Sequence, residues 1–475
     1  MKLKYLCRIF GLAVLLVLAG CDDDDSSSGE APPPADDETP APAPADPSPA
    51  LIRLMHAVVD GPPLFPRIDD LVVAGAAYGQ ASSSFQFDDN DTRMVEVLYE
   101  GPDGEPLVLV DGISLPIGDD REVYVLVHGR FDDPQVAIID NPAFVLPTDN
   151  DGNVIDQNAV DIQFVAGFFQ YESVDVYLTD AAVDIATVNP TVTLARGDVS
   201  PQVEYSADFG WRVRVTPVGE KTVLFDTNSY NMLRARNSVY LLTDFFGTGD
   251  TNLILNRIGL GVNAVIGSIT PPADLRIANF VANTPAVDLY FGDTDDAPEF
   301  DSVPYRTVTE YRSFQDQSVS INLTPEDDNL TFLHERELVM GVSQRLTLLV
   351  SGDAQGDTEG VVLVGDSRPI ANAVQMDVAH AAPDAGDVDV YVLAAGESVD
   401  GNDPTIPDLE YPFFASAQVE LGASSIVFTE RGRSTVVHGP VAIEVQVGFP
   451  TVILTQPEGG GGALSTHILQ DRTLE

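Results

Sequence analysis

Residues 374–392 read VQMDVAHAAPDAGDVDVYV, and this stretch recurs with variation three more times along the chain. The other copies read LRIANFVANTPAVDLYF at residues 275–291, IQFVAGFFQYESVDVYL at 162–178 and IRLMHAVVDGPPLFPRI at 52–68. In the three copies nearest the C-terminus, an Asp and a Tyr follow His380, Asn279 or Ala166 at the same two offsets. A match at fixed offsets, with a period of roughly one hundred residues, predicts four copies of a domain-sized unit.

Each unit carries short segments in which apolar and polar residues alternate, separated by Gly, Pro, Asn and Asp. In the last unit, alternation places Val388 and Val390 on one face of a strand and Asp389 and Tyr391 on the other. Units of this size with short alternating strands are typical of β-sandwiches. We therefore predict an all-β protein with four tandem β-sandwich domains, immunoglobulin-like or related in fold. The predicted divisions are a lipoprotein signal peptide at 1–20, a lipidated Cys and acidic, Pro-rich linker at 21–50, and sandwich repeats at 51–158, 159–272, 273–372 and 373–475.

Two segments of the last copy carry a resemblance to a known family. Residues 380–385 read HAAPDA, and residues 388–391 read VDVY. They resemble the core motif of the bacterial domain of unknown function 4397 family. The sequence departs from that pattern at Asp377, where the family has a basic residue, and at Asn279, which replaces the motif His in the third copy. The resemblance implies an extracytoplasmic, β-rich module and implies no known activity.

The first twenty residues have the features of a secretory signal. Three basic residues precede the apolar run at residues 9–18, which is too short for a stable transmembrane helix. The sequence Leu18-Ala19-Gly20-Cys21 is similar to the lipobox of bacterial lipoproteins. We therefore expect Cys21 to be acylated and to anchor the mature chain in a membrane.

The segment after Cys21 is predicted to be a disordered tether. Residues 22–50 are acidic and Pro-rich and contain no basic residue, so they cannot form an apolar core. The other cysteine, Cys7, lies in the signal, which leaves no pair for an intrachain disulfide. We expect an extracytoplasmic, membrane-anchored lipoprotein, with the outer membrane or cell surface favoured. Asp22 resembles an inner-membrane retention signal, so the inner membrane stays open.

The charge of the chain restricts its partners. Acidic residues number 74 against 24 Lys and Arg, for a formal net charge of −50. Nucleic acids and bare anionic lipid attract proteins through clusters of basic residues, so we expect neither as a partner. The simpler interpretation of the acidity is a strongly solvated surface, and the alternative is capture of cations.

The Asp and Tyr of the repeated motif are candidates for a ligand face. A carboxylate beside an aromatic ring suits sugar recognition, so a polysaccharide or protein ligand is one interpretation. The alternative, which we favour, is packing at a strand edge, in which the Tyr packs over a loop and the Asp caps a turn. The residues concerned are Asp175, Tyr177, Asp288, Tyr290, Asp389 and Tyr391.

One loop resembles a fragment of a calcium site. Asp149, Asp151 and Asn153 alternate as oxygen donors, which can surround a hard cation. Val154 and Val160 stand where an EF-hand has its Gly and closing Glu, and Asp and Asn are common turn formers. Calcium is therefore a weak prediction, and no other cofactor is expected.

No signature of a catalytic nucleophile stands out. G-x-S-x-G is missing, and the segment beginning at His334 has Leu338 where a zincin needs its second His. His56 and His380 are expected to bond to their own turns. The function predicted is a non-enzymatic, lipid-anchored envelope protein acting in adhesion, ligand binding or spacing. The alternative is a hydrolase of envelope or extracellular polymers that uses paired carboxylates.

Overall fold

The structure is a computed structural model, and it describes residues 49–471 with short gaps. The gaps are 88–90, 102–104, 119–120, 143–146, 207–209, 230–235, 247–252, 260–261, 270–271, 316–317, 341–343, 366–367, 369, 372, 446–448 and 457–462. The predicted signal peptide, Cys21 and the predicted tether up to residue 48 lie outside the described residues.

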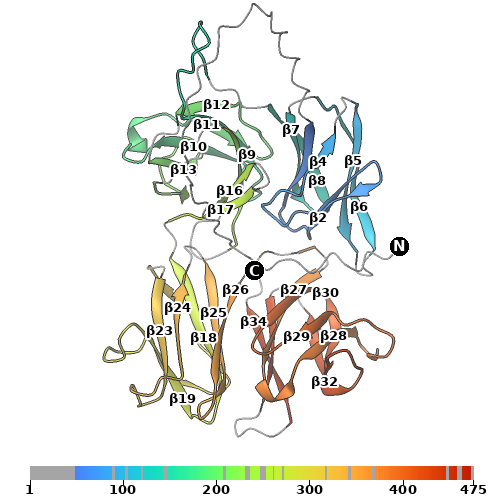
Figure 1. The fold of residues 1–475 in the computed structure, drawn as a ribbon, viewed down its shortest axis with the longest axis vertical. Helices are drawn as coiled ribbons and strands as arrows, with labels where there is room; N and C mark the ends of the chain where they lie inside the picture. The colour runs from blue at the N-terminus through green and yellow to red at the C-terminus, as the bar shows by residue number, and fades with distance from the viewer. Residues whose placement is uncertain are drawn as a thin grey trace, which may run out of the picture.

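The strands fall into four consecutive groups, called sandwiches 1 to 4 below (Figure 1). Sandwich 1 contains β1 (Ala50–Val58), β2 (Leu64–Ile68), β3 (Leu71–Val72), β4 (Phe85–Phe87), β5 (Arg93–Glu100), β6 (Pro106–Leu115), β7 (Arg121–Arg130) and β8 (Asp133–Pro142). Sandwich 2 contains β9 (Ala159–Ala166), β10 (Ser173–Asp180), a 3₁₀ turn η1 (Ile185–Thr187), β11 (Val192–Ala195), β12 (Val203–Ser206), β13 (Trp211–Pro217), β14 (Phe225–Asp226), β15 (Arg236–Asp244), β16 (Leu253–Gly259) and β17 (Val262–Ile266).

The second half of the chain repeats this arrangement. Sandwich 3 contains β18 (Ala273–Ala282), β19 (Ala286–Phe291), β20 (Phe300–Pro304), β21 (Thr307–Val308), β22 (Arg312–Phe314), β23 (Ser318–Pro325), β24 (His334–Val339), β25 (Arg345–Asp353) and β26 (Thr358–Gly365). Sandwich 4 contains β27 (Ala373–Ala381), a 3₁₀ turn η2 (Pro383–Ala385), β28 (Val388–Ala394), β29 (Ile406–Leu409), β30 (Phe414–Glu420), β31 (Gly422–Glu430), β32 (Val436–Val445), β33 (Phe449–Thr455) and β34 (Ser465–Asp471).

Each sandwich has an inner sheet and an outer sheet with the same strand order. The inner sheets run β4-β1-β7-β8, β12-β9-β15-β16-β17, β21-β18-β25-β26 and β30-β27-β33-β34, and β22 also pairs with β18 in the third. The outer sheets run β3-β2-β5-β6, β11-β10-β13-β14, β20-β19-β23-β24 and β29-β28-β31-β32. The first strand of each sandwich, called the motif strand below, lies in the inner sheet and has one parallel neighbour there. These parallel pairs are β1 with β7, β9 with β15, β18 with β25 and β27 with β33. The motif therefore begins in the inner sheet and crosses to the outer sheet.

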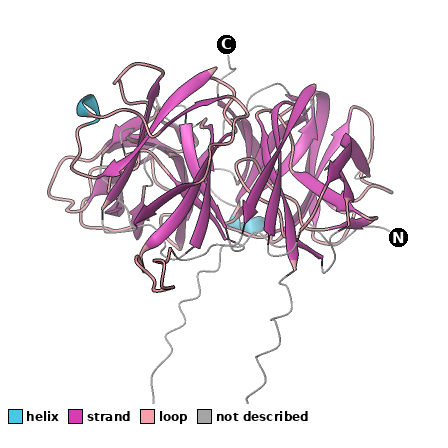
Figure 2. Ribbon diagram, turned by 90° about the horizontal axis from the view of Figure 1, so that it is seen from above, coloured by secondary structure: helices cyan, strands magenta, loops and turns pink. Residues whose placement is uncertain are grey.

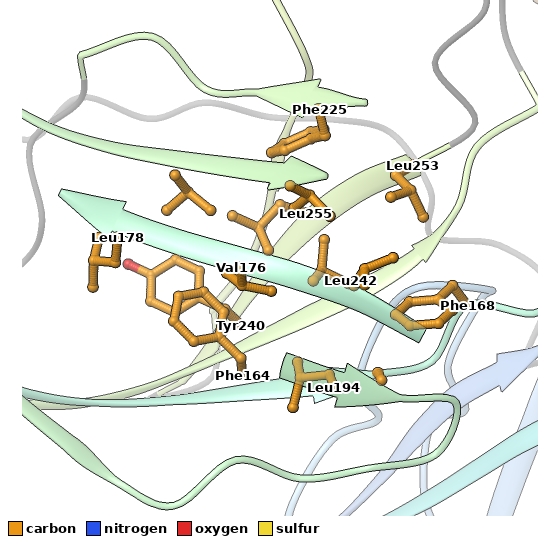
Figure 3. Packing of buried hydrophobic residues seen from close by; sticks show 14 of the residues in the cluster. Phe164, Phe168, Val176, Leu178, Leu194, Phe225, Tyr240, Leu242, Leu253 and Leu255 are labelled. Carbon is orange, nitrogen blue, oxygen red and sulfur yellow. The ribbon is translucent and has the colours of Figure 1, made fainter. Parts of the chain in front are cut away.

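An apolar core fills the space between the two sheets of each sandwich. In sandwich 2, Phe164 and Tyr240 from the inner sheet meet Val176 and Phe225 from the outer sheet (Figure 3). Sandwiches 1, 3 and 4 have comparable clusters of their own. Burial of apolar side chains between two sheets is the main stabilising contribution in such folds. The predicted all-β sandwich fold is confirmed, and Figure 2 shows how completely strands dominate.

The inner sheets also pack against one another, so the sandwiches form two pairs (Figure 1). Met55 and Leu126 of sandwich 1 share a buried cluster with Val239 and Leu241 of sandwich 2. A second cluster joins sandwiches 3 and 4, and it includes Phe280. The inner strands are buried on both faces, which explains why their sequences read as continuous apolar runs. Among the described residues, no helix is long and apolar enough to cross a membrane.

Candidate functional site

The motif His bonds to its own turn, as predicted. In sandwich 4, the Ala382 N–H donates to His380 Nδ1 at 3.3 Å, which places the ring proton on Nε2, and Nε2 lies 2.7 Å from the Gly386 carbonyl. In sandwich 3, Asn279 Oδ1 accepts from the Val281 N–H at 2.9 Å, and its Nδ2 donates to the Val303 carbonyl at 2.9 Å. The Asn amide thus accepts the same backbone N–H, two residues further on, as the imidazole. Its second bond goes to a carbonyl of β20, whereas that of the imidazole goes to its own turn.

Both motif histidines are uncharged parts of the core. His56 and His380 are fully buried. Burial lowers the pKa of His380, and burial together with the nearby charge of Arg368 lowers the pKa of His56 to about 3. The Val58 N–H donates to His56 Nδ1 at 3.2 Å. These rings hold a turn in place and are not available to a ligand.

The motif aspartates tie neighbouring loops to the outer sheet. Asp389 accepts the Asp408 N–H at 2.8 Å and the Gly432 N–H at 2.7 Å. Asp288 accepts the Ser302 N–H at 2.7 Å in the same way. Asp408 and Ser302 both have positive φ, at 58° and 50°, so the carboxylate bonds to the backbone of a left-handed residue beside a bulge. In sandwich 2, Asp175 instead accepts from Gly219 and Thr193.

The motif tyrosines are covered as well. The exposed fractions of Tyr177, Tyr290 and Tyr391 are 1%, 6% and 7%, and those of the three aspartates are similarly small. Lys221 Nζ donates to the Tyr177 hydroxyl at 2.9 Å. The six residues therefore do not present the exposed ligand face considered from the sequence. The alternative interpretation, a packed Tyr and a turn-binding Asp, describes them.

The loop with Asp149, Asp151 and Asn153 closes on its own hydrogen bonds. Asp149 Oδ1 accepts the N–H groups of Asp151 and Asn153, each at 2.9 Å, and Oδ2 accepts from Asn153 Nδ2 at 3.0 Å. The side-chain bond from Asn153 is the main reason why the pKa of Asp149 is lowered. The loop thus has a stable geometry as an Asx turn. Calcium binding at this loop stays a prediction.

The fold assembles a different group of carboxylates, in sandwich 4. Ligand oxygens of Asp387, Asp408 and Glu410 all lie within 4.8 Å of one another. Arg431 bridges two of them, with Nη1 3.0 Å from Asp387 Oδ2 and Nη2 2.5 Å from Asp408 Oδ2. The hydrogen bond that Arg431 donates to the Asp387 carboxylate is the main cause of the raised pKa of Arg431. The group keeps a local excess of negative charge.

A shallow pocket of about 230 Å³ lies beside these carboxylates, and we call it the sandwich 4 pocket. Its lining consists of residues 406–410 and 413–415. Ile406 and Leu409 are buried, whereas Phe413 is 56% exposed. The carbonyl of Phe413 accepts the His380 N–H at 2.9 Å, so the motif strand fixes this wall of the pocket. Within the described part of the chain, Asp408 Oδ1 is buried and receives no hydrogen bond.

Sequence reasoning missed the carboxylate group beside the sandwich 4 pocket because no spacing rule joins its members and Arg431. Asp387 precedes β28, Glu410 and Phe413 lie between β29 and β30, and Arg431 follows β31. These segments meet only because β28, β29 and β31 are neighbours in the outer sheet. The one local sign is the exposed apolar Phe413 within an acidic, Pro-containing stretch.

Comparisons with known proteins add a family match. Residues 273–391, which cover sandwich 3 and the chain to Tyr391 of sandwich 4, match the family described as domain of unknown function (DUF4397). No curated protein matches the chain. Two solved structures are similar to part of this chain, with 9% and 10% sequence identity to it and TM-scores of 0.16 and 0.15. Each match covers 38% of this chain and 92% of the chain in the solved structure. Their titles are "Alpha-glucan binding by a streptococcal virulence factor" and "Alpha-glucan recognition by family 41 carbohydrate-binding modules from streptococcal virulence factors".

Proposed function

We propose that this chain is a lipid-anchored, non-catalytic binding protein of a bacterial cell envelope, and that the sandwich 4 pocket takes a neutral or amine-bearing glycan. The anchor rests on the lipobox-like sequence ending at Cys21 and on the basic, then apolar, segment before it. The acidic linker after Cys21 would hold the folded part away from the membrane surface.

The observation that carries the binding proposal is the exposed ring of Phe413 beside carboxylates in a concave site. An aromatic ring can stack on the C–H face of a sugar, and carboxylate oxygens accept hydrogen bonds from its hydroxyl groups. Three carboxylates against one guanidinium would repel a polyanionic glycan, so the proposal excludes uronic acid polymers.

The rival functions fit the geometry less well. A glycoside hydrolase needs one carboxyl as acid and another as base or nucleophile. Arg431 is ion-paired to both Asp387 and Asp408, which occupies two of the three candidates. A spacer would gain length from sandwiches arranged end to end, whereas these pack side by side through buried inner sheets. A compact binding body agrees better with that packing.

The test is binding of the soluble chain, residues 22–475, to chitosan oligosaccharide, α-glucan and alginate by calorimetry. The proposal expects Phe413→Ala and Glu410→Gln each to weaken binding of a neutral or amine-bearing glycan about tenfold, which corresponds to about 1.4 kcal/mol. Matched controls are Phe332→Ala, an exposed ring in sandwich 3, and Glu335→Gln, an exposed carboxylate on β24. Equal binding by pocket and control variants would contradict the assignment. Binding of alginate alone would also contradict it.

A further inference from the structure

The two pairs of sandwiches meet where the chain passes from sandwich 3 to sandwich 4. Arg368, in that passage, is only 7% exposed. Its Nη1 donates to the carbonyl oxygens of Gly61 at 2.7 Å and Val59 at 3.3 Å, in the loop that follows β1. A buried guanidinium needs several acceptors, and this loop of sandwich 1 supplies two.

A neighbouring residue extends the contact to a third carbonyl. The Ala371 N–H donates to the Asp60 carbonyl at 2.6 Å. Three consecutive carbonyls of sandwich 1 thus accept hydrogen bonds from the passage between sandwiches 3 and 4. The side chain of Asp60 fixes the loop from the other side, because it accepts the Phe131 N–H at 2.7 Å and pairs with Arg130 at 2.9 Å.

The contact also reaches sandwich 2 through Tyr78. The guanidinium carbon of Arg368 lies 4.8 Å from the centre of the Tyr78 ring. The Tyr78 hydroxyl accepts the Asp244 N–H at 3.1 Å and lies 3.4 Å from Asp244 Oδ2, at the end of β15. Asp244 in turn accepts the N–H groups of Phe169 and Gln170 of sandwich 2. Arg368 therefore touches sandwich 1 directly and sandwich 2 through one ring.

We infer that Arg368 is the residue that couples the two pairs of sandwiches into one rigid body. Each pair has a buried apolar cluster of its own between its inner sheets, so each pair persists without Arg368. Loss of the guanidinium removes the group that donates hydrogen bonds to two loop carbonyls, and it removes the cation that lies over the Tyr78 ring. The pairs then change their relative orientation while each keeps its internal geometry. Sandwich 1 directly follows the tether and sandwich 4 holds the pocket, so this coupling fixes the direction of the pocket relative to the anchor.

The test measures distances between spin labels in the soluble chain, residues 22–475, which contains no cysteine. One labelled chain carries Leu71→Cys in sandwich 1 and Leu330→Cys in sandwich 3, both at exposed positions. The distance between these two labels spans the two pairs of sandwiches. A second labelled chain, with Leu71→Cys and Val265→Cys, spans sandwiches 1 and 2 within one pair. We expect Arg368→Ala to broaden the distance distribution between pairs and to leave the distribution within the pair unchanged.

Arg336→Ala is the matched control, because Arg336 is exposed and donates to one carbonyl, that of Gly360, within sandwich 3. It should broaden neither distribution. The inference is overturned if Arg368→Ala leaves the distance between pairs as narrow as in the unsubstituted chain. It is also overturned if Arg368→Ala broadens both distributions, because Arg368 would then support the fold of the first pair and not the coupling.

Discussion

Replacement of His380 tests the structural role of the motif most sharply, because the chain contains its own comparison. His380→Ala removes the partner of the Ala382 N–H, which is buried, and of the carbonyl of Gly386, which is an exposed residue. A buried polar group left without a partner costs about 1–3 kcal/mol, whereas an exposed carbonyl can bond to water. The loss at Ala382 should therefore lower the free energy of unfolding of sandwich 4 by about 1–3 kcal/mol.

His380→Asn should cost less, about 1 kcal/mol, because Asn279 in sandwich 3 accepts the equivalent backbone N–H, so the buried Ala382 N–H can keep a partner. The assay is urea denaturation of the soluble chain, followed by hydrogen exchange of the backbone amides of sandwich 4, because the single Trp, Trp211, lies in sandwich 2. His438→Asn serves as a control, since His438 lies on β32 of the same sandwich and is partly exposed. If His380→Asn destabilises sandwich 4 as much as His380→Ala, the equivalence of Asn and His in the motif is wrong.

The same variants should differ in their dependence on pH. Burial lowers the pKa of His380 below its ordinary value of 6.5, so the folded protein prefers the neutral ring. This contribution to stability is present above pH 6.5 and is lost as the pH falls toward the lowered pKa. A free His titrates between about pH 7.5 and pH 5. When the pH is lowered across this range, the free energy of unfolding of sandwich 4 should fall more in the unsubstituted chain than in His380→Asn. An identical pH dependence for both chains would contradict the assignment of a neutral, buried ring.

Three further predictions concern the anchor, the motif Asp and the charge. Cys21→Ala should abolish incorporation of radiolabelled fatty acid and release the chain from membranes, and equal labelling of both chains would contradict the lipobox. Asp389→Asn should lower the free energy of unfolding by about 2–4 kcal/mol, because a carboxylate accepts two backbone N–H bonds there, whereas Asp387→Asn on the surface should change it by less than about 1 kcal/mol. Raising NaCl from about 0.1 M to about 1 M should raise the melting temperature, because salt screens the repulsion within a chain of net charge −50. A flat or falling melting temperature would show that this repulsion does not limit stability.

The sequence predicts the outer sheets better than the inner ones. Val388 and Val390 face the core of sandwich 4, as their alternation with Asp389 and Tyr391 indicates. Alternation cannot say what covers the opposite face, so the burial of Tyr391 depends on loops that the pattern does not place. The run Leu346 to Val350 does not alternate, because β25 is covered on one face by its own sandwich and on the other by sandwich 4.

The candidate site depends on tertiary structure at every step. Asp408 has a positive φ, which the sequence does not indicate because the residue is not a glycine. Its N–H donates a hydrogen bond to Asp389 of the neighbouring strand. Asp408 and Glu410 become neighbours of Asp387 only through pairing of β28 with β29. In a chain with 74 acidic residues, many pairs of carboxylates look equally promising until the fold selects one group.

The most direct test of the proposed function is the affinity of the soluble chain for glycans, compared with that of the double variant Phe413→Ala, Glu410→Gln. The measurement uses chitosan oligosaccharide, α-glucan and alginate, and thermal unfolding of both chains establishes that the variant keeps its fold. We predict that the unsubstituted chain binds a neutral or amine-bearing glycan and not alginate, and that the double variant loses this binding with an unchanged melting temperature. A chain that binds none of these glycans, or a double variant that binds as tightly as the original, would contradict the proposed function.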